Sequence, residues 1–227
     1  MRISVALDPG QVPRRGAGVA VVVDVLRATS TLTMALANGA RDVTPLASTG
    51  EALARRAREP NALACGERDG RIVPGFDLGN SPLEYTPERV GGRTLLFAST
   101  NGSLAMRAAL AFPRRLLGAF VNASAVLRAI AGERDVTVIC AGKLGGFALE
   151  DTAFAGWLCA RLAADGATLA DAGARLAVSI APADPAGVRA VVEGSSHGRY
   201  LRSLGPEFAR DVEFCGTLDV VDRAFGF

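Results

Sequence analysis

The sequence has few of the residues on which most metal and redox sites depend. It contains one histidine and one tryptophan, and Lys143 is the single lysine among 25 lysine and arginine residues. One histidine excludes a multi-histidine metal site within one chain. The four cysteines are scattered and form no Cys-x-x-Cys pair. This pattern disfavours cysteine-ligated zinc and predicts reduced, mostly buried thiols in a cytoplasmic protein.

Long apolar runs and a strong excess of one charge are also missing. No segment approaches the roughly 18 apolar residues that a transmembrane helix needs. Asp8 and Pro9 interrupt the N-terminal segment early, so it does not have the pattern of a signal peptide. The formal net charge of +2 is small for a protein that binds nucleic acid or a membrane surface. We therefore expect neither kind of partner.

The residues that are present predict a layered α/β fold, with a largely parallel or mixed sheet flanked by helices. With 227 residues, 49% of them hydrophobic, the chain can bury one sizeable core, and we expect a single domain over 1–227. Short β-branched runs alternate with Ala/Leu-rich windows. The glycine- and proline-rich stretch 66–92 predicts an extended loop or lobe. The predicted strands are 3–7, 19–25, 93–98, 115–120 and 135–140, and the predicted helices are 29–38, 50–58, 102–111, 122–131, 151–164, 171–180, 185–193 and 197–204.

Three of the predicted strands are each followed by small polar residues and then a helix. In a mainly parallel sheet the strand ends lie along one edge, where helix N-termini offer free N–H groups to anions. The competing interpretation is that these residues are ordinary helix caps. The candidate residues at the three turns are Asp24, Arg27, Thr29, Ser30, Thr31, Ser99, Thr100, Asn101, Gly102, Ser103, Lys143, Glu150 and Asp151.

Asp24 ends an otherwise apolar strand, so its carboxylate needs a partner. That partner is either a metal ion or the guanidinium of Arg27, and the local sequence does not choose between them. A second acidic and amide cluster comprises Glu67, Asp77 and Asn80 with Ser81. Carboxylate and amide oxygens without a His or Cys cluster suit Mg²⁺. The alternative for this cluster is a plain turn with local side-chain caps.

Two further groups could contact an anion. Lys143 follows a predicted strand, although a solvated loop lysine is the competing interpretation. His197 lies between a serine pair and Arg199 near a predicted helix start, where it is either an anion-binding group or an ordinary surface residue. The chain contains no P-loop, no Rossmann glycine fingerprint and no nucleophile elbow.

Taken together, these segments resemble the 2-phosphosulfolactate phosphatase (ComB-type) family. Each match is short, but all of them occur in the order found in that family. The matching segments are Asp24–Thr31 with Ala37–Ala40, Gly66–Arg68, Gly75–Pro82, Ser99–Ser103, Leu149–Thr152 and Ser196–Leu201.

The resemblance implies an α/β fold peculiar to the family and Mg²⁺-dependent hydrolysis of 2-phosphosulfolactate to 3-sulfolactate and phosphate, a step of coenzyme M biosynthesis. The expected substrate is thus a small phosphorylated organic acid, and a homodimer is compatible with the Ala/Val-rich surface. The alternative is a non-catalytic binder of small anionic metabolites.

As a hypothesis, the resemblance places Mg²⁺ on some of five carboxylates, which are named at the end of this paragraph. Asp24 would either attack the phosphorus or orient a water. Arg27 and the helix-start groups would hold the phosphoryl group. The rest of the substrate would be bound by Asn80, Ser81, Lys143, His197 and Arg199. The proposed metal ligands are Asp24, Glu67, Asp77, Glu150 and Asp151.

Overall fold

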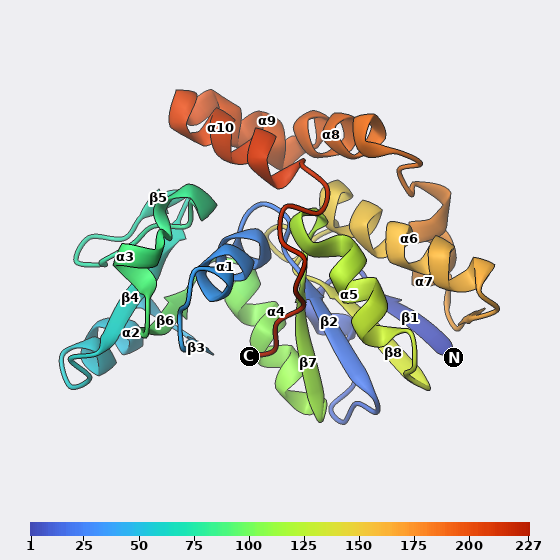
Figure 1. Ribbon diagram of the computed structural model, residues 1–227, viewed down its shortest axis with the longest axis horizontal. Coiled ribbons are helices and arrows are strands. Elements are labelled where there is room, and N and C mark those ends of the chain that lie inside the picture. Colours follow the sequence, from blue (N-terminus) through green and yellow to red (C-terminus); the bar gives the residue numbers. More distant parts are fainter.

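Two β-sheets form the framework of the computed structural model, which describes residues 1–227 (Figure 1). The first sheet is entirely parallel, and in the second only the β4–β5 pair is antiparallel. In spatial order, the first sheet holds β7 (Arg114–Gly118), β2 (Val19–Val23), β8 (Asp135–Cys140), β1 (Arg2–Ala6) and β9 (Thr168–Leu169). The second holds β3 (Asp42–Pro45), β6 (Thr94–Ala98), β4 (Ala62–Arg68) and β5 (Arg71–Ile72). The predicted α/β class is confirmed, although the strands are shared between two sheets.

The side-chain alternation of the strands explains the layers. On β2, Val21 and Val23 pack into one core while Ala20 and Val22 pack into another. The second of these cores also receives β6 from the other sheet, so it lies between the two sheets. The continuous valine run is thus buried on both faces, as its composition predicts.

The helices fill the space between the sheets and cover their outer faces. Side chains of α1 (Ala28–Ala37) and α4 (Gly102–Ala108) belong to the core between the sheets. The outer face of the second sheet packs against α2 (Thr49–Arg56). The outer face of the first sheet packs against α5 (Ala123–Ile130), α6 (Leu149–Ala164) and α7 (Ala172–Ser179).

Three consecutive helices end the chain and lie together at the top of the molecule in Figure 1. They are α8 (Pro185–Gly194), α9 (Ser196–Leu204) and α10 (Pro206–Cys215). Asp184 and Ser195 cap α8 and α9 by accepting backbone N–H bonds three residues on. The remaining elements are the short helix α3 (Pro87–Val90) and four 3₁₀ turns, η1 (Pro9–Gln11), η2 (Pro82–Glu84), η3 (Ala109–Ala111) and η4 (Phe120–Asn122).

The predicted strands and helices agree closely with the observed ones, and their ends differ by a few residues. The predicted set lacks the strands β3, β4, β5 and β9 and the helices α3 and α10. The strand β3 is short, lies at a sheet edge and contains Pro45, while β4 is rich in alanine, a weak strand former. The helix α10 has mixed polarity but carries two boundary signals, Pro206 in its first turn and Gly216 after its end.

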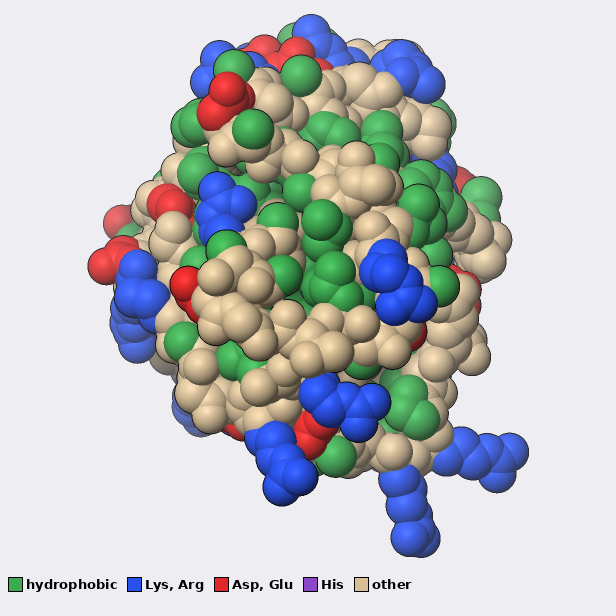
Figure 2. All heavy atoms as spheres, turned by 90° about the vertical axis from the view of Figure 1, so that its right-hand side faces the viewer, with side chains coloured by type: hydrophobic (Ala, Val, Ile, Leu, Met, Phe, Trp, Pro, Cys, Tyr) green, Lys and Arg blue, Asp and Glu red, His purple; other side chains and the backbone are tan.

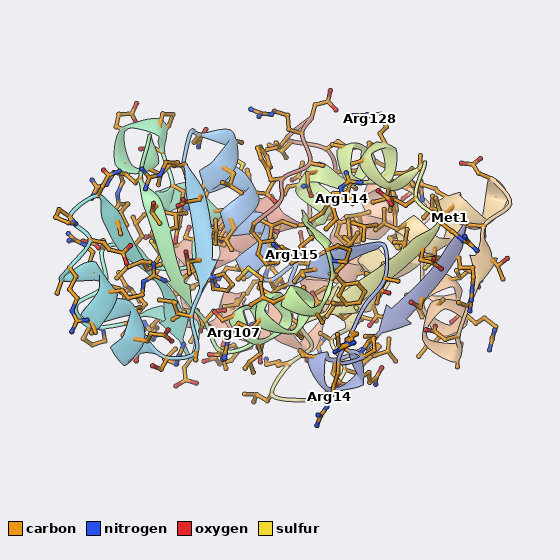
Figure 3. All side chains as sticks on the ribbon, turned by 90° about the horizontal axis from the view of Figure 1, so that it is seen from below. Met1, Arg14, Arg107, Arg114, Arg115 and Arg128 are labelled. Carbon is orange, nitrogen blue, oxygen red and sulfur yellow. The ribbon has the colours of Figure 1, made fainter.

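The surface carries dispersed charge. On the face shown in Figure 2, arginine and acidic side chains lie among hydrophobic and neutral ones. Figure 3 shows the molecule from below, where Arg14, Arg107, Arg114 and Arg115 lie at the end opposite the top helices. Arg114 and Arg115 begin β7, Arg107 lies near the end of α4, and Arg14 lies in the loop before β2. None of them lines the cavity described below. No helix of the structure is both long enough and apolar enough to cross a membrane.

Candidate active site

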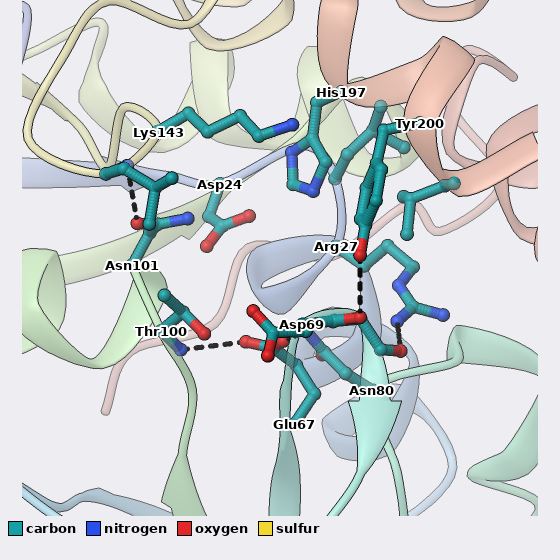
Figure 4. A pocket seen from close by; sticks show the side chains of 14 residues that line it. Asp24, Arg27, Glu67, Asp69, Asn80, Thr100, Asn101, Lys143, His197 and Tyr200 are labelled. Carbon is teal, nitrogen blue, oxygen red and sulfur yellow. Dashed lines mark hydrogen bonds between the residues drawn. The ribbon is translucent and has the colours of Figure 1, made fainter. Parts of the chain in front are cut away.

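A cavity of about 270 Å³ lies where the ends of β2, β4 and β6 meet the loop after β8 and the helix α9. Segments from both sheets therefore contribute to it. Figure 4 shows its polar side chains pointing toward one another. The lining residues are Asp24, Leu26, Arg27, Glu67, Asp69, Gly70, Asn80, Thr100, Asn101, Lys143, Leu144, His197, Tyr200 and Leu201.

Asp24 is the buried carboxylate of this cavity. It follows β2 directly and is 6% exposed. One of its oxygens, Oδ1, accepts a hydrogen bond from the backbone N–H of Ala28 at 3.3 Å. Burial raises the pKa of Asp24 to about 6, with nearby Glu67 and Glu150 also raising it, while His197 and the Ala28 N–H bond lower it. The site thus holds a carboxylate whose charge is poorly compensated by the protein.

The second oxygen of Asp24 lies against the start of α4. A β-carbon added at Gly102 would lie 2.6 Å from Asp24 Oδ2 and 2.5 Å from the β-carbon of Ala28. Glycine at this position therefore lets the helix start approach the carboxylate closely. The predicted phosphate-binding residue Gly102 thus serves the site through close packing.

Arg27 forms the opposite wall, and its partner is not Asp24. Its Nη1 pairs with Asp211 Oδ2 at 2.6 Å, and both side chains are 3% exposed. Its Nη2 donates to the carbonyl of Gly70, and its guanidinium lies 5.2 Å from the ring centroid of Phe208. Asp211 also accepts from the hydroxyl of Ser81 at 2.5 Å. The sequence analysis missed Asp211 because it predicted no helix at α10.

A tight hairpin brings Glu67 to the cavity. Asp69 and Gly70 form the two-residue turn between β4 and β5, and both have positive φ angles, 52° and 78°. This is the Asp-Gly pattern of a hairpin turn, a signal that the sequence analysis did not use. Glu67 Oε2 accepts from Gly70 N–H at 2.8 Å, and Oε1 accepts from Thr100 N–H at 2.7 Å. Glu67 therefore ties the hairpin to the end of β6.

The upper side of the cavity carries the side chains of Lys143 and His197. His197 Nδ1 lies 3.3 Å from Oε1 of Glu150, which is almost fully buried at the start of α6. Lys143 Nζ lies 4.8 Å from the ring centroid of Tyr200, whose hydroxyl donates to the carbonyl of Asp69 at 3.1 Å. Both side chains line the cavity (Figure 4).

Arg199 does not line the cavity, although its neighbours on α9 do. His197, Tyr200 and Leu201 lie at helical spacings of three and four and so share one face. Arg199 points elsewhere, is exposed and bonds the carbonyl of Gly194. Helical periodicity would have indicated Tyr200 and not Arg199 as the neighbour of His197 at the cavity.

Asp77 is also held away from the cavity. Its Oδ2 accepts from Arg56 Nε at 2.9 Å and from the backbone N–H of Ala64 at 2.8 Å. These partners tie the loop before η2 to β4 and to the end of α2. The structure therefore does not bring Asp77 together with Asp24 and Glu67, because Arg56 and the edge of β4 already satisfy its carboxylate.

Asp151 lies deeper than the cavity wall. Its Oδ1 accepts from Val25 N–H at 2.8 Å, and its Oδ2 accepts from Gly142 N–H at 3.1 Å. It thus joins the chain just after β2 to the chain just after β8. Burial, with Glu150 and Asp24 nearby, raises the pKa of Asp151 well above its ordinary value.

Most of the predicted phosphate-binding hydroxyls form internal hydrogen bonds. Thr29 and Ser30 donate to carbonyls of the β2–α1 turn, and Thr31 donates to the carbonyl of Asn80 at 2.9 Å. Ser99 and Ser103 bond each other and each other's backbone N–H. These contacts are internal hydrogen bonds and not helix caps, because neither α1 nor α4 has a side-chain cap bond at its N-terminus. None of these five hydroxyls lines the cavity.

Two buried polar atoms at the cavity have no partner within the protein. They are Oδ1 of Asn80 and Oγ1 of Thr100. Asn80 is 5% exposed, so its oxygen is shielded from solvent. Buried polar atoms of folded proteins are nearly always hydrogen-bonded, and exceptions call for an explanation such as an ion or a ligand.

The donor set suits a hard cation with few protein ligands. No three His, Cys, Asp or Glu side chains are close enough together to hold a metal ion on their own. Mg²⁺, however, commonly binds one or two carboxylates and completes its shell with waters and substrate phosphate. Asp24, Glu67 and the unpartnered oxygen of Asn80 fit that pattern. The five-carboxylate set from the sequence thus reduces to two carboxylates at the cavity.

An α/β fold with a buried, poorly compensated carboxylate, a lysine and an arginine in one small cavity defines an enzyme-like site for a small anion. The family model described as 2-phosphosulpholactate phosphatase matches residues 7–224. The chain belongs to this family, whose members are phosphoric monoester hydrolases.

Relatives over most of the chain carry the same name. The probable 2-phosphosulfolactate phosphatase of Thermotoga petrophila is 41% identical over 201 residues, which are 88% of this chain and 85% of that protein. The one from Carboxydothermus hydrogenoformans is 38% identical over 223 residues, 98% of this chain and 91% of that protein. The one from Deinococcus radiodurans is 40% identical over 206 residues, 88% of this chain and 83% of that protein.

Proposed function

We propose that this protein is a Mg²⁺-dependent phosphatase that hydrolyses 2-phosphosulfolactate, or a related small 2-phospho acid, to 3-sulfolactate and phosphate. The observation that carries the proposal is Asp24, a buried carboxylate facing Lys143 and His197 in a cavity that also holds Arg27. The family membership supports the same reaction. The volume of about 270 Å³ suits a small organic acid.

The charges of the cavity match the two ends of such a substrate. Phosphate-ester hydrolysis needs the charge on the phosphoryl oxygens to be neutralised and a nucleophile to be aligned. Arg27 is held in one position by Asp211 and Phe208, so it offers a fixed positive charge. Lys143 has no carboxylate partner and can reach a carboxylate or sulfonate. Asp24 supplies the carboxylate that attacks phosphorus or orients a water.

Asp24, Glu67 and Asn80 would hold the Mg²⁺. When bound, the ion would neutralise part of the phosphate charge and compensate the carboxylates. Burial and neighbouring Glu67 raise the pKa of Asp24 to about 6, and a bound cation would stabilise the charged form of this carboxylate. The oxygen Oδ1 of Asn80 is buried without a partner and lines the same cavity, which also supports a bound ligand.

The alternative is a non-catalytic binder of small anionic metabolites, which would use the same cavity without turnover. Phosphate release from 2-phosphosulfolactate and 2-phospholactate, measured with Mg²⁺ and with EDTA, separates the two. We expect Mg²⁺-dependent release that vanadate inhibits. Absence of release with either ester, together with ligand-induced thermal stabilisation, would favour the binder.

The Asp24→Asn and Arg27→Ala variants test the location of the site. Each is expected to lower kcat/KM by at least a hundredfold, since removing one group that stabilises the transition state has about that effect. The matched control is Arg199→Ala, which removes an arginine that does not line the cavity. If the Asp24 and Arg27 variants both keep full activity, the site lies elsewhere.

A further inference from the structure

His197 lines the proposed site and contacts Glu150, and neither side chain has been given a chemical step. Glu150 is 1% exposed at the start of α6, and His197 is at the start of α9. Two segments far apart in the chain are therefore joined at the cavity through a contact of 3.3 Å between Nδ1 and Oε1. The buried carboxylate fixes one ring nitrogen, so the other, Nε2, is left for the cavity.

The other proton-bearing groups of the cavity fit this role less well. The hydroxyl of Thr100 has no partner but is too weak an acid, and Lys143 is assigned above to the acid end of the substrate. The hydroxyl of Tyr200 donates to the carbonyl of Asp69. Arg27 is bonded to Asp211 and to the carbonyl of Gly70, and a guanidinium does not give up its proton in proteins. Lys143 has its ammonium group over the ring of Tyr200. His197 alone combines a fixed ring with a free nitrogen, and Figure 4 shows the ring above the centre of the cavity, beside Asp24.

The chemistry of a 2-phospho acid calls for such a group. Its leaving group is an aliphatic alkoxide, which is a poor leaving group unless the ester oxygen receives a proton. A carboxylate on the attacking side and a proton donor on the leaving side must therefore face each other across the phosphorus. Asp24 and His197 line the same cavity from β2 and from α9.

We propose that His197 is the general acid of the reaction and that Glu150 is its positioning residue. The inference rests on the proposed function. The scissile P–O bond breaks, its electron pair stays on the ester oxygen, and that oxygen takes the proton from Nε2 of His197. The new P–O bond forms to the attacking oxygen. If this oxygen belongs to a water, the water gives a proton to Asp24, the products are the alcohol and phosphate, and exchange with solvent then restores the protons of Asp24 and His197. If it belongs to Asp24, the alcohol leaves and the phosphoryl group stays on Asp24. A water then attacks that phosphorus and gives its proton to the now neutral His197, and the P–O bond to Asp24 breaks to release phosphate and the free carboxylate.

A comparison of leaving groups tests this assignment. Acetyl phosphate is small and its acetate leaving group needs no proton, whereas the alkoxide of 2-phospholactate does. We expect His197→Gln to lower kcat for 2-phospholactate by about 10²- to 10⁴-fold. We expect less than a tenfold loss for acetyl phosphate. Equal losses on the two substrates, or no loss on either, would overturn the proposal.

Glu150→Gln is expected to show the same selectivity with a smaller loss. The matched control is Glu193→Gln, because Glu193 also pairs with a cation of α9, Arg202 at 3.2 Å, but lies outside the cavity. This control should leave both rates unchanged. If Glu150→Gln lowers both rates equally, Glu150 has only a structural role and the positioning assignment fails.

A second measurement uses 2-phospholactate alone. His197→Ala removes the ring. Added imidazole should raise the activity of this variant at least tenfold, and the increase should depend on the imidazole concentration. Absence of rescue, in a variant whose thermal unfolding matches that of the wild type, would count against the general acid. If the wild type itself releases no phosphate from any 2-phospho acid, the proposed function fails. If the wild type is active and only the His197 results differ from those expected, the general-acid assignment alone fails.

Discussion

Asp24, the proposed catalytic carboxylate, lowers the stability of the fold at neutral pH. Its pKa is about 6 in the folded protein, against 3.8 for the ordinary side chain, mainly because of burial. The folded state therefore binds a proton more readily than the unfolded chain between these values. It follows that Asp24 makes the protein less stable as the pH rises through this window, and that no further loss occurs above it.

The Asp24→Asn variant should consequently be inactive but more stable at neutral pH. The expected gain is up to about 3 kcal/mol, the equivalent of the pKa difference. Because Asn keeps the oxygen that accepts the Ala28 N–H, the local hydrogen bond is retained. Thermal unfolding in EDTA should show a higher Tm for the variant at pH 7.5 and equal values at pH 3.5.

The same pair of proteins also tests the metal. Added Mg²⁺ should raise the Tm of the wild type at pH 7.5 and leave that of Asp24→Asn nearly unchanged, because the variant lacks the charge that the ion compensates. An equal response of the two proteins would remove Asp24 from the metal ligands.

For the stability prediction, the contrary outcome is a Tm difference between wild type and Asp24→Asn that is the same at pH 3.5 and pH 7.5. It would show that the raised pKa of Asp24 is not the cause.

At the scale of elements, α10 acts on the cavity without lining it. Asp211 reaches from this helix to Arg27 and to Ser81, at 2.6 Å and 2.5 Å. Removing one partner of a buried ion pair leaves the other charge uncompensated, which costs about 3–5 kcal/mol. The position of Arg27 in the cavity thus depends on a helix that belongs to a different part of the chain.

Asp211→Asn is expected to destabilise the fold by about 3 kcal/mol and to lower kcat/KM at least tenfold. The loss of activity should be nearly absent when Arg27 has already been replaced by Ala, since both changes remove one interaction. Urea unfolding and phosphate release measure the two effects. A matched control is Glu207→Gln in the first turn of the same helix. Fully additive losses of activity in the double variant would show that Asp211 acts independently of Arg27.

At the scale of the whole molecule, the cavity lies where the two sheets meet. Asp24 comes from the first sheet, Glu67 and Thr100 from the second, and His197 from the helices at the top. Ligand binding should therefore hold these parts together. A ligand that binds only the folded state, at a hundred times its Kd, adds about 2.7 kcal/mol to stability.

Hydrogen exchange with and without vanadate measures this coupling. Vanadate should slow amide exchange together in the Asp69–Gly70 hairpin, the loop after β8 and the first turn of α9. The strand β5 (Arg71–Ile72) of this hairpin is exposed to solvent. Slower amide exchange in this strand would therefore report the bound ligand. The loop between α7 and α8, which does not line the cavity, is the internal reference. Protection confined to one sheet would contradict a ligand site shared by both.

The agreement between sequence and structure depends on how local the relevant signal is. Three features were predictable: the valine run of β2, Asp24 at the end of this strand, and the helix that follows. Burial on two faces and the strand-to-helix turn each depend on the types of adjacent residues. The hydroxyls Thr29–Thr31 were harder, since the same residue types serve as caps and as ligands. The structure gives those hydroxyls to the backbone and leaves Thr100 free.

The sequence by itself determined the α/β class, the buried strands and the family of this protein. It did so because periodicity and short motifs are properties of neighbouring residues. The tertiary structure alone decided which side chains meet: it divided the strands between two sheets, gave Asp77 to Arg56 and Arg27 to Asp211, and set His197 against Glu150. The physical reason is that a charged group takes whichever partner packing brings within a few ångströms, and that choice depends on contacts between segments distant in the chain.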